Sequence, residues 1–330
     1  MQRQCTIVMY HYVRDLVETR FKEIRGLNLS LFREQIGYLK RYYEFVTVED
    51  CLEAISGGRE LPNNATLLTF DDGYIDHYLN VFPILNDAGI KGCFFPPVCS
   101  IREGRVLDVN KIHFILASVN NPEKIKKEAF NMLDRLRSEG HEIKPNEELY
   151  NKLAIRNEWD LMPLVFIKRL LQKELPQDLR SKIIDRLFKR YVTKNEIAFA
   201  RELYMNEEQL RMMVKHGMAI GCHGYEHRWM DTLSNLDQFD EILSSLELLK
   251  STGMSLDNWL MCYPYGAHNK SLRKVCSDLG CGMALTSEVD IAQLNKENVL
   301  TLPRLDTNHL PKGANIPPND WTKKILKNNS

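Results

Sequence analysis

The chain has 330 residues, with 44 basic and 44 acidic side chains and a hydrophobic content of 44%. This length fits about two domains or one large α/β barrel. The balanced charge argues against a nucleic-acid-binding protein, which usually carries a basic excess, and the composition excludes disordered and fibrous classes.

Membrane and export signals are not apparent in the sequence. It contains no run of 18 apolar residues, so we expect no membrane span. The first eleven residues lack the long apolar region and the small-residue cleavage site of a signal peptide. The eight cysteines form no Cys-x-x-Cys pair and are typical of reduced thiols. We therefore expect a cytoplasmic location.

The first hundred residues alternate short apolar runs with amphipathic stretches, which predicts repeated βα units. Strands are expected over 6–12, 45–48, 65–70 and 92–95. Helices are expected over 48–55 and 81–87, and from an N-cap at Ser30 to residue 42.

The pattern then changes. Residues 141–216 contain no glycine, and Leu179, Ile183 and Leu187 follow one another at helical spacing with basic residues between them. We interpret about 110–204 as a helical insertion, with additional barrel helices as the alternative. The insertion is a candidate lid and a candidate surface for forming a homo-oligomer.

The βα pattern resumes at residue 205. Helices are expected over 206–215, 237–249 and 270–279, and strands over 218–222, 259–263, 282–286 and 299–302. The tail from about 311 is rich in Pro, Asn and Lys, and we expect it to be flexible. Residues 1–330 therefore form a single domain that the insertion interrupts.

Two adjacent carboxylates, Asp71 and Asp72, follow the predicted strand 65–70 and precede Gly73. Active sites of α/β proteins lie at the C-terminal ends of strands, so these carboxylates are well placed for chemistry. The alternative is an ordinary strand-to-turn junction, because Asp and Gly are also favoured in turns.

Two histidines, His223 and His227, follow another predicted strand. Alone, the pair could be a surface or capping feature. Two imidazoles and one carboxylate, however, make a three-ligand site with open positions, as catalytic zinc requires. A second carboxylate beside the ligand then supplies a base that activates water.

Three further strand ends carry candidate residues. The turn at 263–266 presents a backbone N–H that could face an oxyanion. His11 follows the first strand, and Arg304 follows the last and could hold a carboxylate by a bidentate pair. The alternatives are an ordinary turn, a structural histidine and a charge on the rim.

The ordered segments Thr-Phe-Asp-Asp-Gly-Tyr (69–74), His-Gly-Tyr-Glu-His (223–227) and Tyr-Pro-Tyr-Gly (263–266) resemble the polysaccharide deacetylase family, the NodB-homology domain of carbohydrate esterase family four. The resemblance covers roughly 64–104 and 205–305, together with the early Tyr-His segment. It implies an α/β fold, a distorted (β/α) barrel of about seven strands related to the TIM barrel.

The resemblance also implies roles for individual residues. Asp71 would be the general base, and the backbone N–H of Tyr265 would form part of the oxyanion hole. The ligands of a divalent metal, usually Zn²⁺, would be Asp72, His223 and His227. Candidate substrate contacts within the same motifs are Tyr74, Tyr225 and Pro264. The implied reaction is hydrolytic removal of the acetyl group from an N-acetylated amino sugar.

The sequence departs from the family pattern at two places. Cys262 stands where the family has an arginine two residues before the motif proline, and the late Leu-x-x-His motif of the general acid is not evident. His11 resembles a histidine found in members with a permuted motif order, so we favour it as the general acid. His309 is the competing candidate, and Arg304 is a candidate replacement for the missing arginine beside Asp71.

The sequence thus predicts a metal-dependent N-deacetylase of surface-polysaccharide or glycoconjugate biosynthesis. Its expected partner is an N-acetylated sugar or sugar conjugate, linked in the cytoplasm to a nucleotide or a lipid, and no nucleic acid. Two alternatives remain open: a non-catalytic sugar-binding protein with a degenerate site, and a non-heme iron oxygenase. Oxygenases of that kind are usually all-β proteins.

Overall fold

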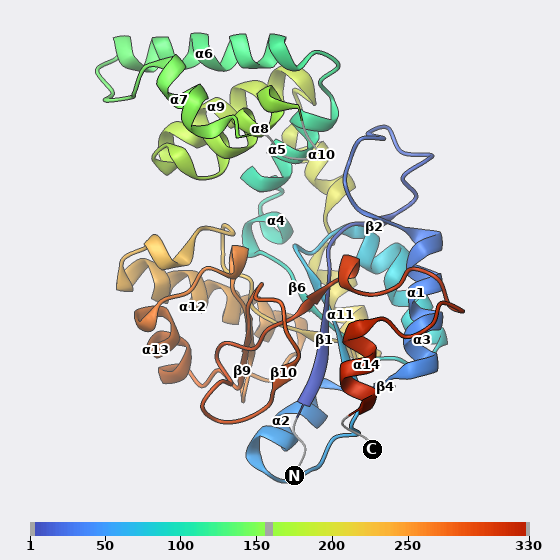
Figure 1. Ribbon diagram of the computed structural model, residues 1–330. Helices are drawn as coiled ribbons and strands as arrows, with labels where there is room; N and C mark the ends of the chain where they lie inside the picture. The colour runs from blue at the N-terminus through green and yellow to red at the C-terminus, as the bar shows by residue number, and fades with distance from the viewer. Residues whose placement is uncertain (1–3, 156–160, 328–330) are drawn as a thin grey trace. The chain divides into compact units, whose positions relative to one another are not determined.

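The computed structural model describes residues 4–155 and 161–327 and divides into two compact units (Figure 1). The first unit comprises Met1–Leu16, Gly26–Arg105 and Ala200–Ser330, and the second comprises Val17–Arg25 and Val106–Phe199. The predicted insertion, about 110–204, falls largely in the second unit. Residues 17–25, which the sequence does not assign to the insertion, belong to the second unit as well.

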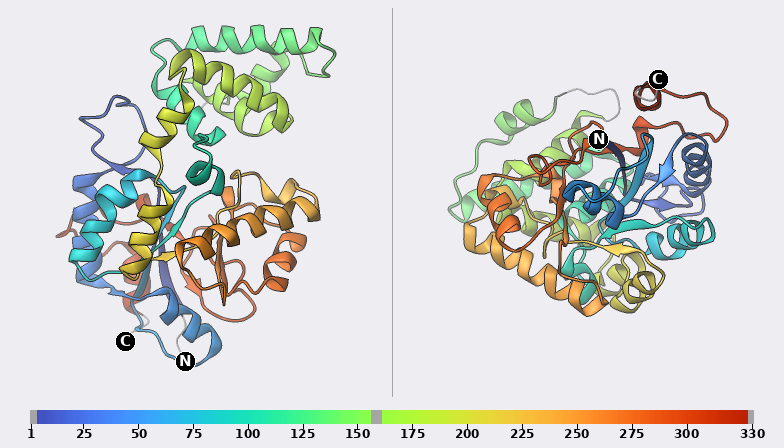
Figure 2. Two further views of the ribbon diagram at one scale, coloured as in Figure 1. Left: turned by 180° about the vertical axis from the view of Figure 1, so that it is seen from behind. Right: turned by 90° about the horizontal axis from the view of Figure 1, so that it is seen from below.

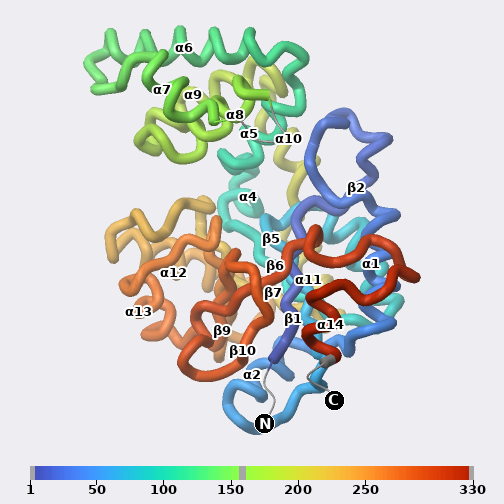
Figure 3. The backbone as a smooth tube through the Cα atoms, in the orientation of Figure 1, coloured from blue at the N-terminus to red at the C-terminus, as the bar shows by residue number. Residues whose placement is uncertain are grey.

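The first unit is built mainly on parallel strands, and β10 pairs antiparallel with β1. β5 lies between β1 and β6, and β6 pairs with β7, all in parallel register; Figure 3 labels β5, β6 and β7 close to one another near the centre of the unit. The strands are β1 (Gln4–Tyr10), β2 (Val13–Arg14), β3 (Leu27–Asn28), β4 (Glu44–Phe45), β5 (Ala65–Asp71), β6 (Gly92–Phe95), β7 (Ala219–Ile220), β8 (Leu260–Cys262), β9 (Met283–Leu285), β10 (Ala292–Gln293) and β11 (Leu305–Asp306).

Pairing continues around the first unit until it returns to β1. A bridge between Cys222 and Met261 connects the end of β7 to β8, and β8 pairs with β9. A bridge between Leu285 and Leu302 then leads into β11, which is parallel to β1. The expected distorted barrel is confirmed. The strand expected over 299–302 is wrong in its position, because only Leu302 makes a bridge and the paired strand follows at β11.

The helices of the first unit surround its strands, as the view from below in Figure 2 shows. They are α1 (Leu29–Tyr42), α2 (Val48–Ser56), α3 (Phe82–Asp87), α4 (Val98–Arg102), α11 (Glu207–Lys215), α12 (Asn235–Thr252), α13 (Lys270–Asp278) and α14 (Asp320–Lys327), with the short turns η1 (His77–Val81), η3 (Met230–Thr232), η4 (Pro264–Gly266) and η5 (Thr307–His309). The N-cap of α1 is Asn28 rather than Ser30, because the Asn28 side chain accepts the N–H of Ser30 at 2.9 Å.

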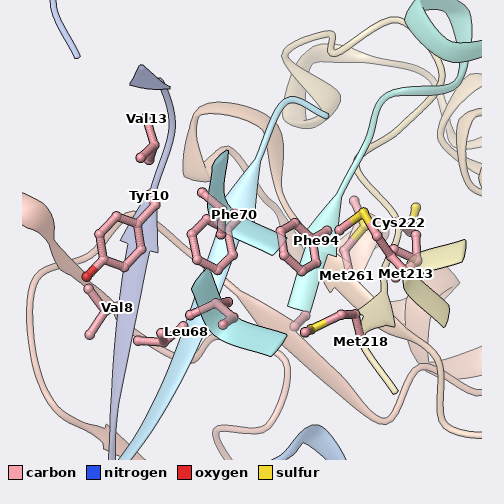
Figure 4. Packing of buried hydrophobic residues seen from close by; sticks show 14 of the residues in the cluster. Val8, Tyr10, Val13, Leu68, Phe70, Phe94, Met213, Met218, Cys222 and Met261 are labelled. Carbon is pink, nitrogen blue, oxygen red and sulfur yellow. The ribbon is translucent and has the colours of Figure 1, made fainter. Parts of the chain in front are cut away.

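Successive side chains of β1, β5 and β6 point alternately toward the surrounding helices and toward the interior of the barrel. Tyr10, Phe70 and Phe94 point toward the helices and stack in a row, with ring centroids 5.0 and 4.7 Å apart (Figure 4). Leu67 and Phe95 point the other way and pack with side chains of β8, β9 and α2 inside the barrel. Because side chains alternate with a period of two, Asp71 lies on the inner face at the C-terminal end of β5.

Part of the C-terminal tail is helical. Thr322 of α14 is buried, and its hydroxyl lies 2.7 Å from the hydroxyl of Tyr38 and 2.9 Å from that of Tyr43. The tail therefore contains more regular structure than its composition predicts.

The second unit is helical among its described residues. Its helices are α5 (Asp108–Ala117), α6 (Pro122–Ser138), α7 (Asn146–Leu153), α8 (Met162–Arg169), η2 (Leu170–Glu174), α9 (Gln177–Tyr191) and the first half of α10 (Glu196–Leu203). Phe21 packs edge-on against Phe114 and Phe199, which explains why 17–25 joins this unit. Throughout residues 4–155 and 161–327, no helix is long and apolar enough to cross a membrane.

Candidate metal centre

The two adjacent carboxylates lie at a strained turn directly after β5. Asp72 has φ 72° and Gly73 has φ 66°, a left-handed conformation that residues other than glycine adopt uncommonly. Glycine is required at the second position, since a Cβ there would approach the Cβ of Pro96 at 2.8 Å. The turn separates the directions of the two carboxylates, so that Asp71 and Asp72 meet different partners.

Asp72 is buried and faces both histidines of the second motif. Its Oδ1 lies 3.4 Å from Nε2 of His223 and 3.3 Å from Nε2 of His227. Its Oδ2 accepts a hydrogen bond from the hydroxyl of Tyr74 at 2.5 Å. Oδ1 has no hydrogen-bond partner among the described residues. One carboxylate oxygen is therefore anchored, and the other is directed at two imidazole nitrogens.

The imidazoles present the nitrogens that a metal needs. Nδ1 of His223 donates to the carbonyl oxygen of Cys262 at 2.7 Å, which directs Nε2 toward Asp72. Burial opposes the charged form of His223, but Cys262 and Asp72 raise its pKa well above the ordinary value, so a metal ion would displace a proton from Nε2. Burial lowers the pKa of His227 to about 3, so this imidazole is neutral at physiological pH. Neutral imidazole is the form that binds metal ions.

The donor set fits a divalent cation. The three ligand atoms lie within 4.8 Å of one another. Tetrahedral zinc ligands, bound at about 2.0–2.1 Å, are about 3.3 Å apart, which matches the two contacts of Asp72 Oδ1. An ion would also satisfy this oxygen, which otherwise costs free energy as a buried unpaired acceptor. Aspartate and histidine accept several divalent metals, so the donors do not select one.

Asp71 is held by Arg304. Nη1 and Nη2 of Arg304 donate to Oδ1 and Oδ2 of Asp71 at 2.9 and 2.8 Å. The remaining donors reach Thr69 Oγ1 at 3.2 Å, Cys262 Sγ at 3.2 Å and the carbonyl oxygen of Thr286 at 2.9 Å. All five N–H groups of the guanidinium are thus engaged, and the pair is rigid.

This environment keeps Asp71 ionised. Burial raises the pKa of Asp71, but the charge of Arg304, with smaller contributions from His11 and His223, outweighs it and lowers the pKa to about 2. At position 262, where the family pattern has an arginine, this chain has only the thiol of Cys262, whose Sγ lies 3.4 Å from Asp71 Oδ2. Arg304 therefore supplies the cation that position 262 lacks.

The two candidate acids have different surroundings. Nε2 of His11 lies 3.9 Å from Oδ2 of Asp71, and the His11 side chain is 41% exposed. His309 lies in η5, where its Nδ1 accepts the N–H of Asp306 at 3.0 Å and its ring contacts Trp321. The structure thus brings His11, and not His309, into contact with Asp71.

The third motif forms η4 beside the metal donors. Tyr265 has φ 59°, a left-handed conformation for a bulky residue. Its ring packs against His227 with a centroid distance of 4.6 Å and stacks on Trp229 at 4.3 Å. Pro264 is buried at the start of η4. The ring of Tyr265 thus lies between the candidate metal donor His227 and the half-buried Trp229.

Two expected substrate contacts have different surroundings. Tyr74 is fully buried, and its hydroxyl donates to Asp72, so the structure places it against a candidate metal donor, and its contact with substrate stays a prediction. Tyr225 is half-buried, and its backbone N–H is bound by Glu241. Glu241 and His77 are functional candidates that the sequence analysis does not find, because neither lies in a motif.

His77 contacts the backbone of His11. It is buried, and its Nε2 lies 2.9 Å from the carbonyl oxygen of His11. Burial lowers the pKa of His77 to about 4. The unfolded chain, with an ordinary histidine pKa near 6.5, binds a proton in this range that the folded protein does not. The contribution of His77 to stability is therefore complete above pH 6.5 and is lost as the pH falls toward 4.

We expect His77→Gln to remove this pH dependence. Between pH 6.5 and 4, the free energy of unfolding of the metal-free protein should fall by up to about 3 kcal/mol more in the wild type than in the variant. Urea unfolding at several pH values measures the difference. His216→Gln, at an exposed position, is the matched control and should keep the wild-type slope. Equal slopes for wild type and His77→Gln would contradict the prediction.

Comparison with known proteins gives concordant matches. The family model for polysaccharide deacetylases matches residues 176–284, which include both histidines and η4. The chain is 41% identical over 80 residues to the poly-beta-1,6-N-acetyl-D-glucosamine N-deacetylase of Escherichia coli strain K12. That match covers 24% of this chain and 12% of the relative, so the detected similarity spans a small part of both proteins.

Solved structures share the fold over nearly the whole chain. The Streptococcus pyogenes deacetylase PplD, solved in complex with acetate, superposes with a TM-score of 0.57 and 17% identity, covering 99% of this chain and 98% of that one. IcaB from Ammonifex degensii superposes with a TM-score of 0.53 and 16% identity, covering 98% and 96%. At these identities, the comparison establishes a common fold.

Proposed function

We propose that the chain, whose residues 176–284 match the polysaccharide deacetylase family model, is a metal-dependent hydrolase that removes the acetyl group from an N-acetylated amino sugar. The observation that carries the proposal is the convergence of Asp72, His223 and His227 beside an ionised carboxylate. A structural metal site has no use for that second carboxylate, whereas hydrolysis requires a base.

The metal centre would be formed by Asp72, His223 and His227, with Zn²⁺ as the expected ion. When bound, a divalent ion there lowers the pKa of water and polarises the acetamide carbonyl. Asp72 is prepared for this role because Tyr74 fixes one of its oxygens. His223 is prepared because the Cys262 carbonyl fixes its tautomer.

Asp71 would act as the general base. Arg304 keeps the carboxylate ionised and oriented, so that it can accept the proton of the attacking water. The water oxygen forms a bond to the acetamide carbon, and the backbone N–H of Tyr265 would stabilise the resulting oxyanion. His11, 3.9 Å from Asp71, would donate a proton to the leaving amine as the C–N bond breaks. The products are acetate and the free amino sugar.

The proposed substrate class is supported by the family match and by the relative in Escherichia coli, whose name specifies poly-β-1,6-N-acetyl-D-glucosamine. We propose an N-acetylated hexosamine as the reacting unit, in surface-polysaccharide or glycoconjugate synthesis. A cytoplasmic nucleotide- or lipid-linked intermediate stays a prediction from the sequence, as does a homo-oligomer formed through the helical insertion, about 110–204.

Metal removal should abolish activity. We expect acetate release from β-1,6-linked N-acetylglucosamine oligomers, or from nucleotide- or lipid-linked N-acetylglucosamine, to stop after dialysis against a chelator and to return with added Zn²⁺. His227→Ala should not regain activity with Zn²⁺, whereas His309→Ala, outside the metal donors, should bind Zn²⁺ normally. An enzymatic acetate assay and metal analysis measure both.

Other outcomes would favour the alternatives. Acetate release that persists after complete metal removal would contradict the proposed metal centre. Sugar binding without acetate release from any substrate would favour a non-catalytic binding protein. Oxygen-dependent turnover with Fe(II) would favour the oxygenase, although the parallel barrel differs from the usual fold of that class.

A further inference from the structure

The segment of residues 223–227, here called the histidine loop, carries two metal donors but is not regular structure. Its carbonyl oxygens at Gly224 and Tyr225 accept the N–H groups of Val98 and Cys99 at 3.2 and 3.0 Å. These bonds come from the start of α4 and fix one edge of the loop. They leave the N–H groups between the two histidines to other partners.

Glu241 of α12 accepts these N–H groups. Its Oε2 lies 2.6 Å from the backbone nitrogen of Tyr225 and 3.2 Å from that of Glu226. One carboxylate oxygen therefore binds two consecutive amides, both between the metal donors His223 and His227. Together with α4, Glu241 holds the loop from both edges.

Burial of the Glu241 carboxylate reduces the stability of the fold unless hydrogen bonds compensate for the lost hydration. The residue is only 6% exposed, while Leu236 of the same helix is 77% exposed. Burial raises the pKa of Glu241 to about 7, against the lowering effects of the Glu226 N–H and, to a smaller extent, of Arg228. Burial of a carboxylate is unfavourable without hydrogen bonds to compensate it. The two loop amides provide that compensation.

The loop backbone is adapted to this carboxylate. Gly224 has φ 73°, and a Cβ at this position would lie 3.0 Å from Oε2 of Glu241. Any larger residue would be strained in this conformation and would crowd the oxygen that binds the next two amides. The glycine thus allows the close approach of Glu241.

We propose that Glu241 is a positioning residue that fixes the histidine loop, so that the imidazoles of His223 and His227 converge on Asp72. The inference rests on the proposed metal centre. Glu241 is neither a proposed metal donor nor one of the proposed catalytic groups. It acts through the backbone between the two histidines, as partners of metal ligands commonly do.

Three variants test this role. Glu241→Ala removes the acceptor, and we expect the affinity for Zn²⁺ to fall about 10- to 100-fold. Glu241→Gln keeps an acceptor oxygen, so its affinity should change less than about tenfold. Gln238→Ala is the matched control, because Gln238 is a buried polar residue of the same helix that donates to the carbonyl of Met230 at 2.8 Å, outside the loop. It should leave the affinity unchanged.

Competition with a chromophoric chelator measures the Zn²⁺ affinity, and amide hydrogen exchange measures the protection of Tyr225 and Glu226 in the metal-free protein. We expect Glu241→Ala to lose this protection and Gln238→Ala to keep it. Unchanged affinity and protection in Glu241→Ala, or an equal loss in Gln238→Ala, would overturn the inference. If the wild type binds no divalent metal, the proposed function fails, while hydrogen exchange still tests the contact of Glu241 with the loop.

Discussion

Asp71→Asn is expected to abolish acetate release while Zn²⁺ binding is retained. The amide cannot accept the proton of the attacking water, and general-base catalysis contributes about 10²- to 10⁴-fold. Asp71 is not among the proposed donors Asp72, His223 and His227, so the metal content should stay close to that of the wild type. Acetate assays and metal analysis of the same preparation measure both quantities.

The neighbouring carboxylate provides the matched control. Asp72→Asn makes the same chemical change one residue further along the chain, but it weakens a metal donor, so we expect loss of bound Zn²⁺ together with activity. The two variants should therefore differ in metal content and not in activity. An active Asp71→Asn protein would contradict the assignment of Asp71 as the base.

Arg304→Met is expected to reduce both stability and activity strongly. Removing one partner of a buried ion pair leaves the carboxylate of Asp71 desolvated and unpaired, which costs about 3–5 kcal/mol. The carboxylate also loses its bidentate orientation, and misplacement of a catalytic group by about 1 Å can cost roughly 10²-fold in rate. Urea unfolding and acetate assays at neutral pH measure these effects.

A double variant separates the ion pair from simple packing. Asp71→Asn combined with Arg304→Met removes both charges, so it should be more stable than Arg304→Met alone, although it stays inactive. Cys262→Ala is the control, because the thiol contacts both groups but carries no counter-charge. We expect it to keep most of the activity. Additive losses in the double variant would show that the pair does not act as a unit.

The barrel could be predicted because its principal strands are continuous apolar runs that end in recognisable turns. The expected strand over 65–70 agrees with β5 to within one residue. The end of the chain was less predictable, since β11 is only two residues long and depends on pairing with β1. The N-cap of α1 was misplaced because Asn28 and Ser30 are both good capping residues, and only the backbone geometry distinguishes them.

The candidate site shows a similar division. Residues within the three motifs, and Arg304 after the last strand, could be named from their positions at predicted strand ends. The roles of Tyr74, His77 and Glu241 could not, because each depends on a hydrogen bond to a group whose position only the folded chain defines. A weak signal existed for Glu241: it shares the buried side of α12 with polar residues at helical spacing, where apolar side chains are usual.

The ion pair of Asp71 and Arg304 joins residues 233 positions apart in the sequence. During ribosomal synthesis, Asp72, His223 and His227 all emerge before Arg304 does. A nascent chain that has passed residue 227 therefore already contains every proposed metal donor, but the base has no counter-ion. Contacts of such long sequence separation form slowly. The side chain that fixes the proposed base is thus among the last parts of the site to be synthesised, and catalytic competence should be among the last properties that the folding chain acquires.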